Sequence, residues 1–300
     1  MLSSTTVELL AAAGLDEHLV VNVVQRALDE DLAYGPDVTS LATVPADQRV
    51  RAAFVARKGG TLAGVAVVAT SLDVVVGPEW WSFLGATSDG ARLERDELAL
   101  EIEAPTQRLL TAERTALNFL CHLSGVATLT AEWVSAVAGT RAKVRDTRKT
   151  TPGLRVLDKY AVRCGGGVNH RMGLGDAALI KDNHVVAAGG VAQAVAAVRA
   201  AAPNISLEVE CDSLAQVRAA VEAEVALVLL DNMSVSEIAE AVDWVRGKSP
   251  SVELEASGGL TLETVRAVAE TGVDYVAVGA LTHSAPSLDI GLDVISVLGG

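Results

Sequence analysis

The chain has 300 residues and a formal net charge of -14 at pH 7, which argues against nucleic acid and anionic membranes as partners. Hydrophobic residues make up 50% of the sequence but aromatic residues only 3%, so the core must consist mainly of Ala, Val and Leu. No apolar stretch reaches the roughly 20 residues that a bilayer-spanning helix needs, and no signal-peptide pattern opens the chain. The three cysteines are widely separated, as is usual in a reducing compartment, so we expect a soluble, cytoplasmic protein.

The first 140 residues predict one mixed domain and a long helix. Residues 5–30 have the pattern of an amphipathic helix. Short strand-like runs then alternate with Gly-rich turns over residues 49–103: "RAAFVARKGG", "TLAGVAVV" and "ELALEIEA". A long helical pattern follows Pro105 over residues 107–138, and it is interrupted at Ser124-Gly125.

After residue 140 the chain alternates regularly between short β-like and longer helical runs. The predicted strands are "AKVRD" (142–146), "AALIK" (177–181), "SLEVE" (206–210), "ALVLL" (226–230), "VELEA" (252–256) and "YVAVG" (275–279). The predicted helices lie at 190–202, 213–223, 234–247 and 261–271. Such alternation indicates a parallel sheet or barrel, and six strands fall short of the eight in a complete barrel. We therefore expect a shortened or open α/β barrel, after which the last residues return to the first domain.

A basic segment at residues 141–181 stands out in this acidic chain. It contains ten of the 24 Lys and Arg residues but three acids, a net charge of +7. Two interpretations are open: a solvated basic face, or a pocket for a small polyanion. Arg148, Lys149, Arg171 and Lys181 would supply the positive charge of such a pocket, since Arg pairs with carboxylates through two parallel hydrogen bonds and Lys acts as a point charge.

The later predicted strands end in acidic and glycine residues. Glu210 and Asp231 could bind Mg2+ directly or through its waters, or hold ribose hydroxyls. "SGGL" (257–260) and "VGALTH" (278–283) each follow a strand and open a helix, where backbone N–H groups can bind a phosphate. Active sites of α/β barrels lie at the carboxyl ends of the strands, so these residues predict a site for a sugar phosphate beside the basic segment.

Two further residues have competing interpretations. His170 lies within the basic segment and is either a structural histidine or part of the site. Arg114 shares a helix face with Leu110, Leu117 and Cys121. A structural pair with Glu113 or another acid, or extension of the side chain to solvent, would explain an arginine there. The alternative is that this face meets a site or a second subunit.

Several long segments resemble the quinolinate phosphoribosyltransferase family, the carboxylating nicotinate-nucleotide pyrophosphorylases. They are "ERTALNFLCHLSG" (113–125), "DTRKTTPGLR" (146–155), "KYAVRCGGGVNHRMGLGDAALIKDNH" (159–184), "LEVECDS" (207–213), "LLDNM" (229–233), "LEASGGL" (254–260) and "GVDYVAVGALTHSAPSLDIGLD" (272–293). The first domain fits more loosely, through "DEDLAYGPDVTS" (29–40).

The resemblance implies an α/β fold in two domains: an N-terminal α/β sandwich at 1–116, joined by the C-terminal segment 284–300, and an open, shortened α/β barrel at 117–283. It implies a homodimer, or a higher oligomer, in which Arg114 reaches the partner's active site. The implied substrates are quinolinate and phosphoribosyl pyrophosphate, and the implied cofactor is Mg2+. The products are nicotinate mononucleotide, pyrophosphate and CO2, a step of de novo NAD biosynthesis.

The resemblance also assigns roles to residues. The quinolinate side is made by Thr147, Arg148, Lys149, His170, Arg171 and Lys181. Lys149 and Lys181 also reach phosphate groups and, with Glu210 and Asp231, are the implied catalytic residues; the two acids hold the Mg2+. The phosphate loops are formed by Ser257, Gly258 and Gly259, and by Gly279, Ala280 and His283.

Two other functions share parts of this pattern. A paralogue of the same fold, such as a molybdenum-locus protein or a non-carboxylating nicotinate enzyme, would not need so many cations around one ring. A non-catalytic binder of sugar phosphates or small diacids would not need Glu210 and Asp231 beside two phosphate loops. No Ser-His-Asp or Cys-His set is present, so covalent catalysis is not indicated.

Overall fold

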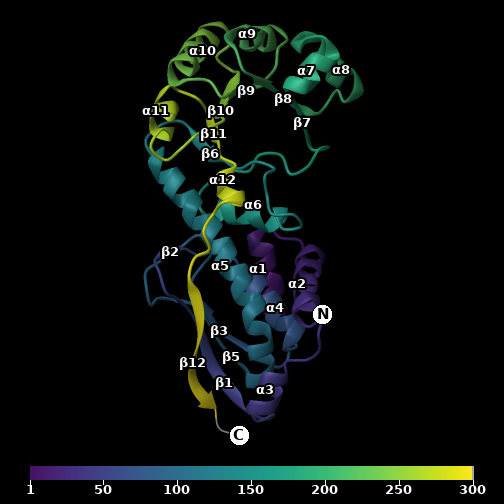
Figure 1. Cartoon of the computed structure of the whole chain (residues 1–300), viewed down its shortest axis with the longest axis vertical. Helices are drawn as coiled ribbons and strands as arrows, with labels where there is room; N and C mark the ends of the chain where they lie inside the picture. The colour runs from purple at the N-terminus through teal and green to yellow at the C-terminus, as the bar shows by residue number, and fades with distance from the viewer. Residues whose placement is uncertain (299–300) are drawn as a thin grey trace. The chain divides into compact units, whose positions relative to one another are not determined.

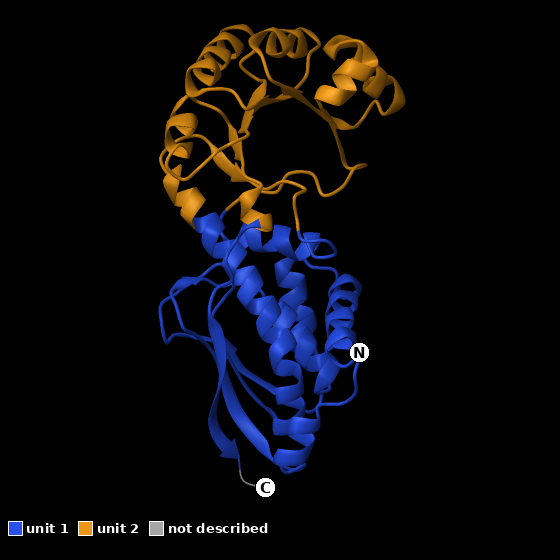
Figure 2. Ribbon diagram, viewed as in Figure 1, with its two compact units in different colours: residues 1–131, 151–166, 284–300 blue, residues 132–150, 167–283 orange. Residues whose placement is uncertain are grey.

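The computed structural model describes residues 1–298, which form two compact units (Figure 2). Among these residues the first unit comprises 1–131, 151–166 and 284–298, and the second comprises 132–150 and 167–283. The predicted boundary at 116/117 differs from this division, because one continuous helix carries the chain from the first unit into the second. Among the described residues no single helix is long and apolar enough to cross a membrane; the helices Asp182–Ala188 and Val191–Ala201 meet this test only as a pair bent by 89°.

The second unit is built on six parallel strands, as predicted. Their order in the sheet is β6-β11-β10-β9-β8-β7, and the two outer strands β6 and β7 do not pair with each other. The strands are β6 (Lys143–Arg145), β7 (Ala177–Ile180), β8 (Ser206–Cys211), β9 (Leu227–Asp231), β10 (Glu253–Ser257) and β11 (Tyr275–Ala277). The barrel is therefore open, and the predicted fold class is confirmed.

Helices follow the strands and lie outside them, around the curved sheet (Figure 1). They are α7 (Asp182–Ala188), α8 (Val191–Ala201), α9 (Leu214–Glu222), α10 (Val235–Lys248), α11 (Val265–Glu270) and α12 (Ala280–His283). Right-handed βα connections place the carboxyl ends of all parallel strands at one edge of the sheet, where the loops into the helices meet.

The first unit contains an antiparallel four-stranded sheet of order β12-β1-β5-β3. Its strands are β1 (Arg49–Ala56), β3 (Ser82–Ala86), β5 (Leu98–Pro105) and β12 (Ile290–Leu298), and a small second sheet pairs β2 (Gly60–Thr61) with β4 (Arg92–Leu93). The C-terminal strand β12 pairs with β1 along its whole length, from Ile290 opposite Ala56 to Leu298 opposite Arg49. The end of the chain thus completes the sheet that begins near residue 49.

The predicted helix at 5–30 is two helices, α1 (Ser4–Ala13) and α2 (Glu17–Asp31). Gly14 ends α1 in the left-handed conformation at φ 64°, and the Asp16 side chain accepts a hydrogen bond from the Leu19 N–H to begin α2. The prediction overlooked this Gly-x-Asp sequence, which is a helix stop followed directly by a helix start. The remaining helix before α4 is the short α3 (Val38–Thr43).

The strand-like interpretation of "TLAGVAVV" was wrong, because residues 65–75 form the helix α4 (Val65–Val75). Val65 to Asp73 are all buried, so α4 is apolar on every side and shows no amphipathic period. The Asp89 carboxylate accepts hydrogen bonds from the Gly64 and Val65 N–H groups, an N-terminal cap supplied from 24 residues away. Local sequence could not reveal this cap.

The long helix α5 (Thr106–Ala136) is continuous, so the predicted interruption at Ser124-Gly125 was also wrong. Gly125 serves close packing instead: a Cβ at this position would lie 2.2 Å from the Pro286 carbonyl oxygen. A second helix of the same unit, α6 (Arg155–Cys164), packs equally close, since a Cβ on Gly165 would meet the Ala127 carbonyl oxygen at 2.4 Å.

We predict that Gly125→Ala destabilises the protein by about 1–3 kcal/mol, because a backbone carbonyl cannot move aside as a flexible side chain would. Urea-induced unfolding followed by circular dichroism measures the change. Gly247→Ala is the matched control: Gly247 also lies in a helix, but no atom lies within 4 Å of its added Cβ. The control should be more stable by up to about 1 kcal/mol, and a similar gain in Gly125→Ala would contradict the packing argument.

Candidate active site

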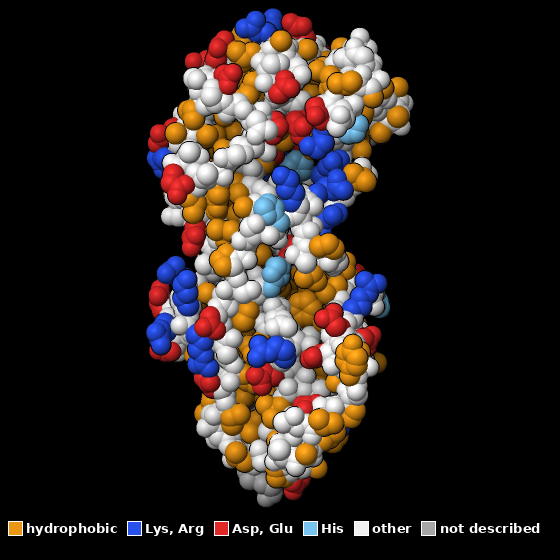
Figure 3. Space-filling model, in the orientation of Figure 1, with side chains coloured by type: hydrophobic (Ala, Val, Ile, Leu, Met, Phe, Trp, Pro, Cys, Tyr) orange, Lys and Arg blue, Asp and Glu red, His pale blue; other side chains and the backbone are white. Residues whose placement is uncertain are grey.

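A cavity of about 700 Å3 opens at the carboxyl ends of the barrel strands. Every predicted site residue in the barrel lines it: Thr147, Arg148, Lys149, His170, Arg171, Lys181, Glu210, Asp231, Ser257, Gly258, Gly259, Gly279, Ala280 and His283. On the face drawn in Figure 3, Lys and Arg side chains gather over the barrel unit beside acidic ones. The fold therefore brings together groups separated by up to 136 positions in sequence, from Thr147 to His283.

Two arginines concentrate positive charge in the cavity. Burial, followed by the neighbouring Arg148, lowers the pKa of Arg171, so the two guanidinium groups act on each other. The Nε atom of Arg148 is buried and has no hydrogen-bond partner among residues 1–298. Arg171 is held by its Nη1, which donates to the Ala177 carbonyl oxygen at 2.9 Å. Two cations that face one cavity favour an anion between them.

The loop after β6 is fixed at its backbone. Thr147 Oγ1 accepts a hydrogen bond from the Lys149 N–H at 3.0 Å, and Thr282 Oγ1 donates to the Lys149 carbonyl oxygen at 2.8 Å. Gly279 permits close approach of the Lys149 stem, since a Cβ on Gly279 would lie 2.9 Å from Lys149 Cδ. The loop of β6 and the loop of β11 thus position each other.

The glycine pair after β10 adopts a left-handed backbone, with φ 89° at Gly258 and φ 61° at Gly259. A Cβ on Gly258 would collide with the neighbouring loop, 2.3 Å from Asn232 Oδ1. The Asn232 N–H donates to the Ser257 carbonyl oxygen at 2.9 Å, which links this loop to the one after β9. A compact glycine turn at the end of a strand is suited to a phosphate, because its backbone N–H groups can bind an anion.

Glu210 and Asp231 line the same cavity, from the ends of β8 and β9. Glu210 forms an ion pair with Lys181, and Asp231 Oδ2 accepts a hydrogen bond from Asn232 Nδ2 at 2.7 Å. Carboxylate oxygens at a water-accessible edge are the donors that Mg2+ prefers, because this ion usually keeps several waters and few protein ligands. The donor set fits Mg2+ beside a turn that is suited to a phosphate.

Asp146 is a buried carboxylate that the sequence reasoning treated only as a strand end. Its side chain is 0% exposed and accepts hydrogen bonds from the His170 N–H at 2.8 Å and from Asn169 Nδ2 at 2.5 Å. Asp146 immediately precedes the basic loop after β6, and His170 immediately precedes Arg171. One buried acid therefore joins the two basic segments of the site.

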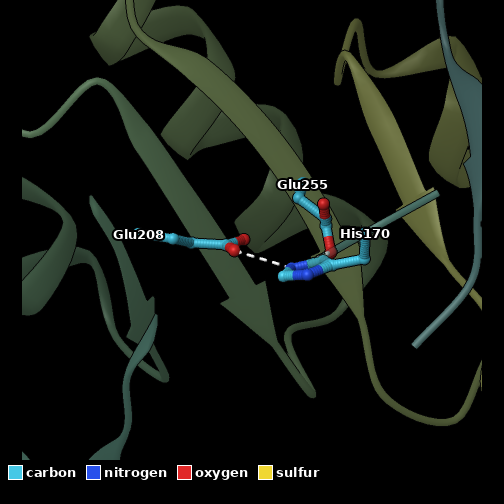
Figure 4. A group of neighbouring side chains, drawn as sticks. All are labelled: His170, Glu208 and Glu255. Atoms are coloured by element: carbon cyan, nitrogen blue, oxygen red, sulfur yellow. Dashed lines mark hydrogen bonds and ion pairs between the residues drawn. The ribbon is translucent and has the colours of Figure 1, made fainter. Parts of the chain in front are cut away.

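A second group of buried side chains, His170, Glu208 and Glu255, lies at the base of the cavity, which His170 and Glu255 line (Figure 4). His170 Nε2 lies 2.7 Å from Glu208 Oε2 and 3.7 Å from Glu255 Oε1. Arg145 Nη1 pairs with Glu255 Oε2 at 2.5 Å, and its guanidinium stacks over the Tyr275 ring at 4.3 Å. Burial and the neighbouring Glu208 raise the pKa of Glu255 to about 7.

This group has the side chains of a metal site but is filled by a cation already. Among residues 1–298 it is the one set of three His, Cys, Asp or Glu side chains whose ligand atoms all lie within 4.8 Å of one another. Arg145 pairs with Glu255 in the same place, and a divalent ion would have to displace it. The group is better described as a buried ionic network.

The sequence analysis missed Glu208 and Glu255 because it considered the residue at the end of each strand. A signal was available: side chains two positions apart on a strand point to the same face, and Glu208 precedes Glu210 by two. The other cavity residues not predicted are Leu179, Leu229, Asn232, Leu260, Ala277 and Val278. The leucines, Ala277 and Val278 give the cavity apolar walls, on which a planar ring can rest.

Arg114 lies in the other unit, exposed on α5. It forms no ion pair within the described part of the chain, so the predicted alternative of a pair with Glu113 does not hold here. Its placement in a partner's site stays a prediction.

Comparison with known proteins agrees with the predicted family. Residues 37–124 match the quinolinate phosphoribosyl transferase N-terminal domain, and residues 126–293 match the C-terminal domain of the same family. The chain is 56% identical over 273 residues to the nicotinate-nucleotide pyrophosphorylase [carboxylating] of Mycobacterium leprae, covering 91% of this chain and 96% of that protein.

Solved structures agree in fold. NadC from Streptococcus pyogenes superimposes with a TM-score of 0.89 at 40% identity, covering 95% of this chain and 99% of that one. The nicotinate-nucleotide pyrophosphorylase from Francisella tularensis gives a TM-score of 0.88 at 37% identity, covering 93% and 97%.

The buried network predicts a pH dependence of stability. Glu255 has a raised pKa in the folded state, so the folded protein holds a proton between about pH 4.5 and 7 that the unfolded chain releases. Stability should therefore fall as pH rises through this range. We predict that the free energy of unfolding of the unsubstituted protein, relative to Glu255→Gln, falls on the order of 1–3 kcal/mol between about pH 5 and 7.5.

Urea titrations of both proteins at the two pH values test this. Glu253→Gln is the control, because Glu253 lies on the same strand but is exposed. A difference between the unsubstituted protein and Glu255→Gln that does not vary with pH would show that Glu255 does not bind this proton.

Proposed function

The chain belongs to the quinolinate phosphoribosyltransferase family, and we propose how its barrel cavity carries out the reaction of that family. The enzyme transfers the phosphoribosyl group of phosphoribosyl pyrophosphate to quinolinate with decarboxylation. The products are nicotinate mononucleotide, pyrophosphate and CO2, and the reaction belongs to de novo NAD biosynthesis.

One observation carries the assignment of substrates to this cavity. Arg148 and Arg171 line the same cavity and act on each other electrostatically, and the cavity also contains two acids and two glycine turns. Paired guanidinium groups suit a dicarboxylate, and glycine turns suit a phosphate. A single small anion would leave most of these groups unused.

The reaction balances in two stages. The C1–O bond of the ribose breaks and pyrophosphate leaves, while the pyridine nitrogen forms a bond to C1. The C2–carboxylate bond then breaks with loss of CO2, and the electron pair left on C2 is stabilised by the adjacent positive nitrogen until C2 takes a proton from solvent.

We assign the quinolinate carboxylates to Arg148 and Arg171, with Thr147 and His170 beside them. Lys149 and Lys181 are assigned to the region between the two substrates, where each can meet a carboxylate or a phosphate. The contribution of the protein is mainly to hold the reacting atoms together and to supply fixed charge, which costs no reorganisation during the reaction.

We propose Mg2+ as the cofactor, held by Glu210 and Asp231 directly or through its waters. When bound, Mg2+ neutralises charge on the departing pyrophosphate. The Lys181 ion pair holds the Glu210 carboxylate at the cavity that both residues line. Ser257, Gly258, Gly259, Gly279 and Ala280, with His283, are the proposed ligands of the ribose 5-phosphate.

We predict that the purified protein releases labelled CO2 from quinolinate carrying the label in its 2-carboxylate, only when phosphoribosyl pyrophosphate and Mg2+ are both present. Arg148→Ala should lower kcat/KM for quinolinate by about a hundredfold or more, because a buried carboxylate loses a charged partner. Arg199→Ala is the matched control, since Arg199 is an exposed barrel arginine bonded to main-chain oxygens outside the cavity.

Wild-type turnover in Arg148→Ala would contradict the assignment of this arginine. Nucleotide formation from nicotinate without CO2 release would favour a non-carboxylating paralogue, and substrate binding without turnover would favour a binding protein. An equal rate after removal of divalent ions would contradict the proposed cofactor.

We also propose that the protein is a homodimer, or a higher oligomer built from it, in which Arg114 enters the partner's cavity. The exposure of Arg114, without an acid partner among residues 1–298, supports this arrangement. An arginine at the rim of the partner's cavity would add a further cation for the dicarboxylate.

Hybrid dimers test the proposal. Arg114→Ala and Arg148→Ala are co-expressed with different tags, and the species carrying both tags is isolated. If Arg114 serves the partner, one site of the hybrid is intact, and we predict about half of the wild-type activity per dimer although each parent homodimer is nearly inactive. An inactive hybrid would show that Arg114 acts in the active site of its own chain. Each of the two sites would then contain one of the two substitutions.

A further inference from the structure

Glu208 and Glu210 lie on the same face of β8 but in different layers of the barrel. Glu210 is opposite Leu229 of β9, and Leu229 is opposite Glu255 of β10, so these three residues form one row across the sheet. Glu208 is opposite Leu227, one row farther from the carboxyl ends of the strands. Glu210 and Glu255 line the cavity, whereas Glu208 lies beneath it and is 4% exposed.

The Glu208 side chain points from β8 to the His170 ring (Figure 4). His170 Nε2 lies 2.7 Å from Glu208 Oε2. The other ring nitrogen, Nδ1, accepts a hydrogen bond from the Arg171 N–H, also at 2.7 Å. The second bond requires a lone pair on Nδ1, so Nε2 carries the proton and donates it to Glu208. Glu208 therefore selects the tautomer that fixes the backbone of Arg171.

The Asn169–Arg171 segment needs such anchors because it belongs to no helix or strand. Asp146 holds the segment through the His170 N–H, and Glu208 holds it through the His170 ring. With these two anchors the start of the Arg171 side chain has a defined position, and the Ala177 carbonyl oxygen fixes its guanidinium end.

Stability alone does not account for Glu208. A buried carboxylate costs several kcal/mol, and replacing a buried ionic network by apolar side chains often leaves a protein as stable or more so. Glu208 Oε1 is buried without a hydrogen-bond partner among residues 1–298. Hydrogen bonds within the protein therefore replace only part of the hydration that this carboxylate loses on folding. A costly group in contact with a residue that lines the cavity suggests a role in the reaction.

We propose that Glu208 is a positioning residue for quinolinate, which acts through His170 to orient Arg171 toward the dicarboxylate. The inference rests on the proposed function of the cavity. Glu208 itself does not touch substrate, because it lies one row below the cavity lining.

Glu208→Gln tests the proposal, since it keeps the shape but replaces a charged acceptor by a neutral amide. Titration calorimetry of quinolinate without phosphoribosyl pyrophosphate should show a dissociation constant raised about tenfold or more, the size of a lost bond to a charged group. In steady state the KM for quinolinate should rise more than kcat falls, and the KM for phosphoribosyl pyrophosphate should stay within about twofold.

A double-mutant cycle with His170→Gln tests whether Glu208 acts through the ring. In the His170→Gln background, Glu208→Gln should not weaken quinolinate binding any further, because the effects of substitutions within one network are not additive. Full additivity of the two effects would overturn the proposal.

Asp274→Asn is the matched control for loss of a largely buried acid. Asp274 pairs with Arg141 and Arg246 at 2.6 Å in the same unit but does not line the cavity. It should lower thermal stability and leave quinolinate binding unchanged. If Glu208→Gln fails to fold, Glu208→Asp keeps the charge but shortens the reach to Nε2, and it should weaken quinolinate binding in the same way.

The outcomes separate this inference from the proposed function. An unsubstituted protein that neither binds quinolinate nor releases CO2 would contradict the proposed function. An active unsubstituted protein beside a folded Glu208→Gln with unchanged quinolinate affinity would overturn the role of Glu208 alone.

Discussion

The repulsion between cations that meet in one cavity is the constraint on which this site depends. Burial and, after it, the charge of Arg148 lower the pKa of Arg171, so the two guanidinium groups repel each other. Flexible loops would relieve that repulsion by moving the guanidinium groups apart. Buried carboxylates prevent this. Asp146 joins the two basic segments through the His170 N–H, and Glu208 holds the His170 ring. The basic segments that line the cavity are thus anchored by buried acids.

The open parallel barrel makes this arrangement possible. Residues two apart on one strand point to the same side but lie in successive rows, so β8 contributes Glu210 to the cavity and Glu208 to the layer beneath it. The same strands that end at the cavity therefore supply its support. An all-apolar layer beneath the cavity would pack as well but could not accept a hydrogen bond from His170.

Much of the barrel could be predicted from sequence because strands and helices alternate with regular spacing and every predicted strand ends at or next to a polar or glycine residue. The cavity lining was predicted for the same reason, because the carboxyl ends of parallel strands meet at one edge of the sheet whatever the conformation of the connecting loops. Features that depend on distant parts of the chain were not predictable. The cap of α4 by Asp89 and the approach of Pro286 to Gly125 are long-range contacts, and their absence from local sequence explains the wrong interpretations of residues 61–68 and 124–125. Glu208 and Glu255 were not predicted because they look like ordinary charged residues within strands.

The layered charges also explain why a dicarboxylate suits this cavity better than a monocarboxylate. Asp146 and Glu208 accept hydrogen bonds from His170, and Glu255 pairs with Arg145, so these acids leave Arg148 and Arg171 with excess positive charge in the cavity. Two substrate carboxylates can pair with both guanidinium groups, whereas one leaves a cation desolvated without a partner. Because Asp146 and Glu208 hold the segment of Arg171 before substrate arrives, this arginine needs little ordering on binding. The selectivity of the cavity then comes from the rigid spacing of its cations as much as from their number.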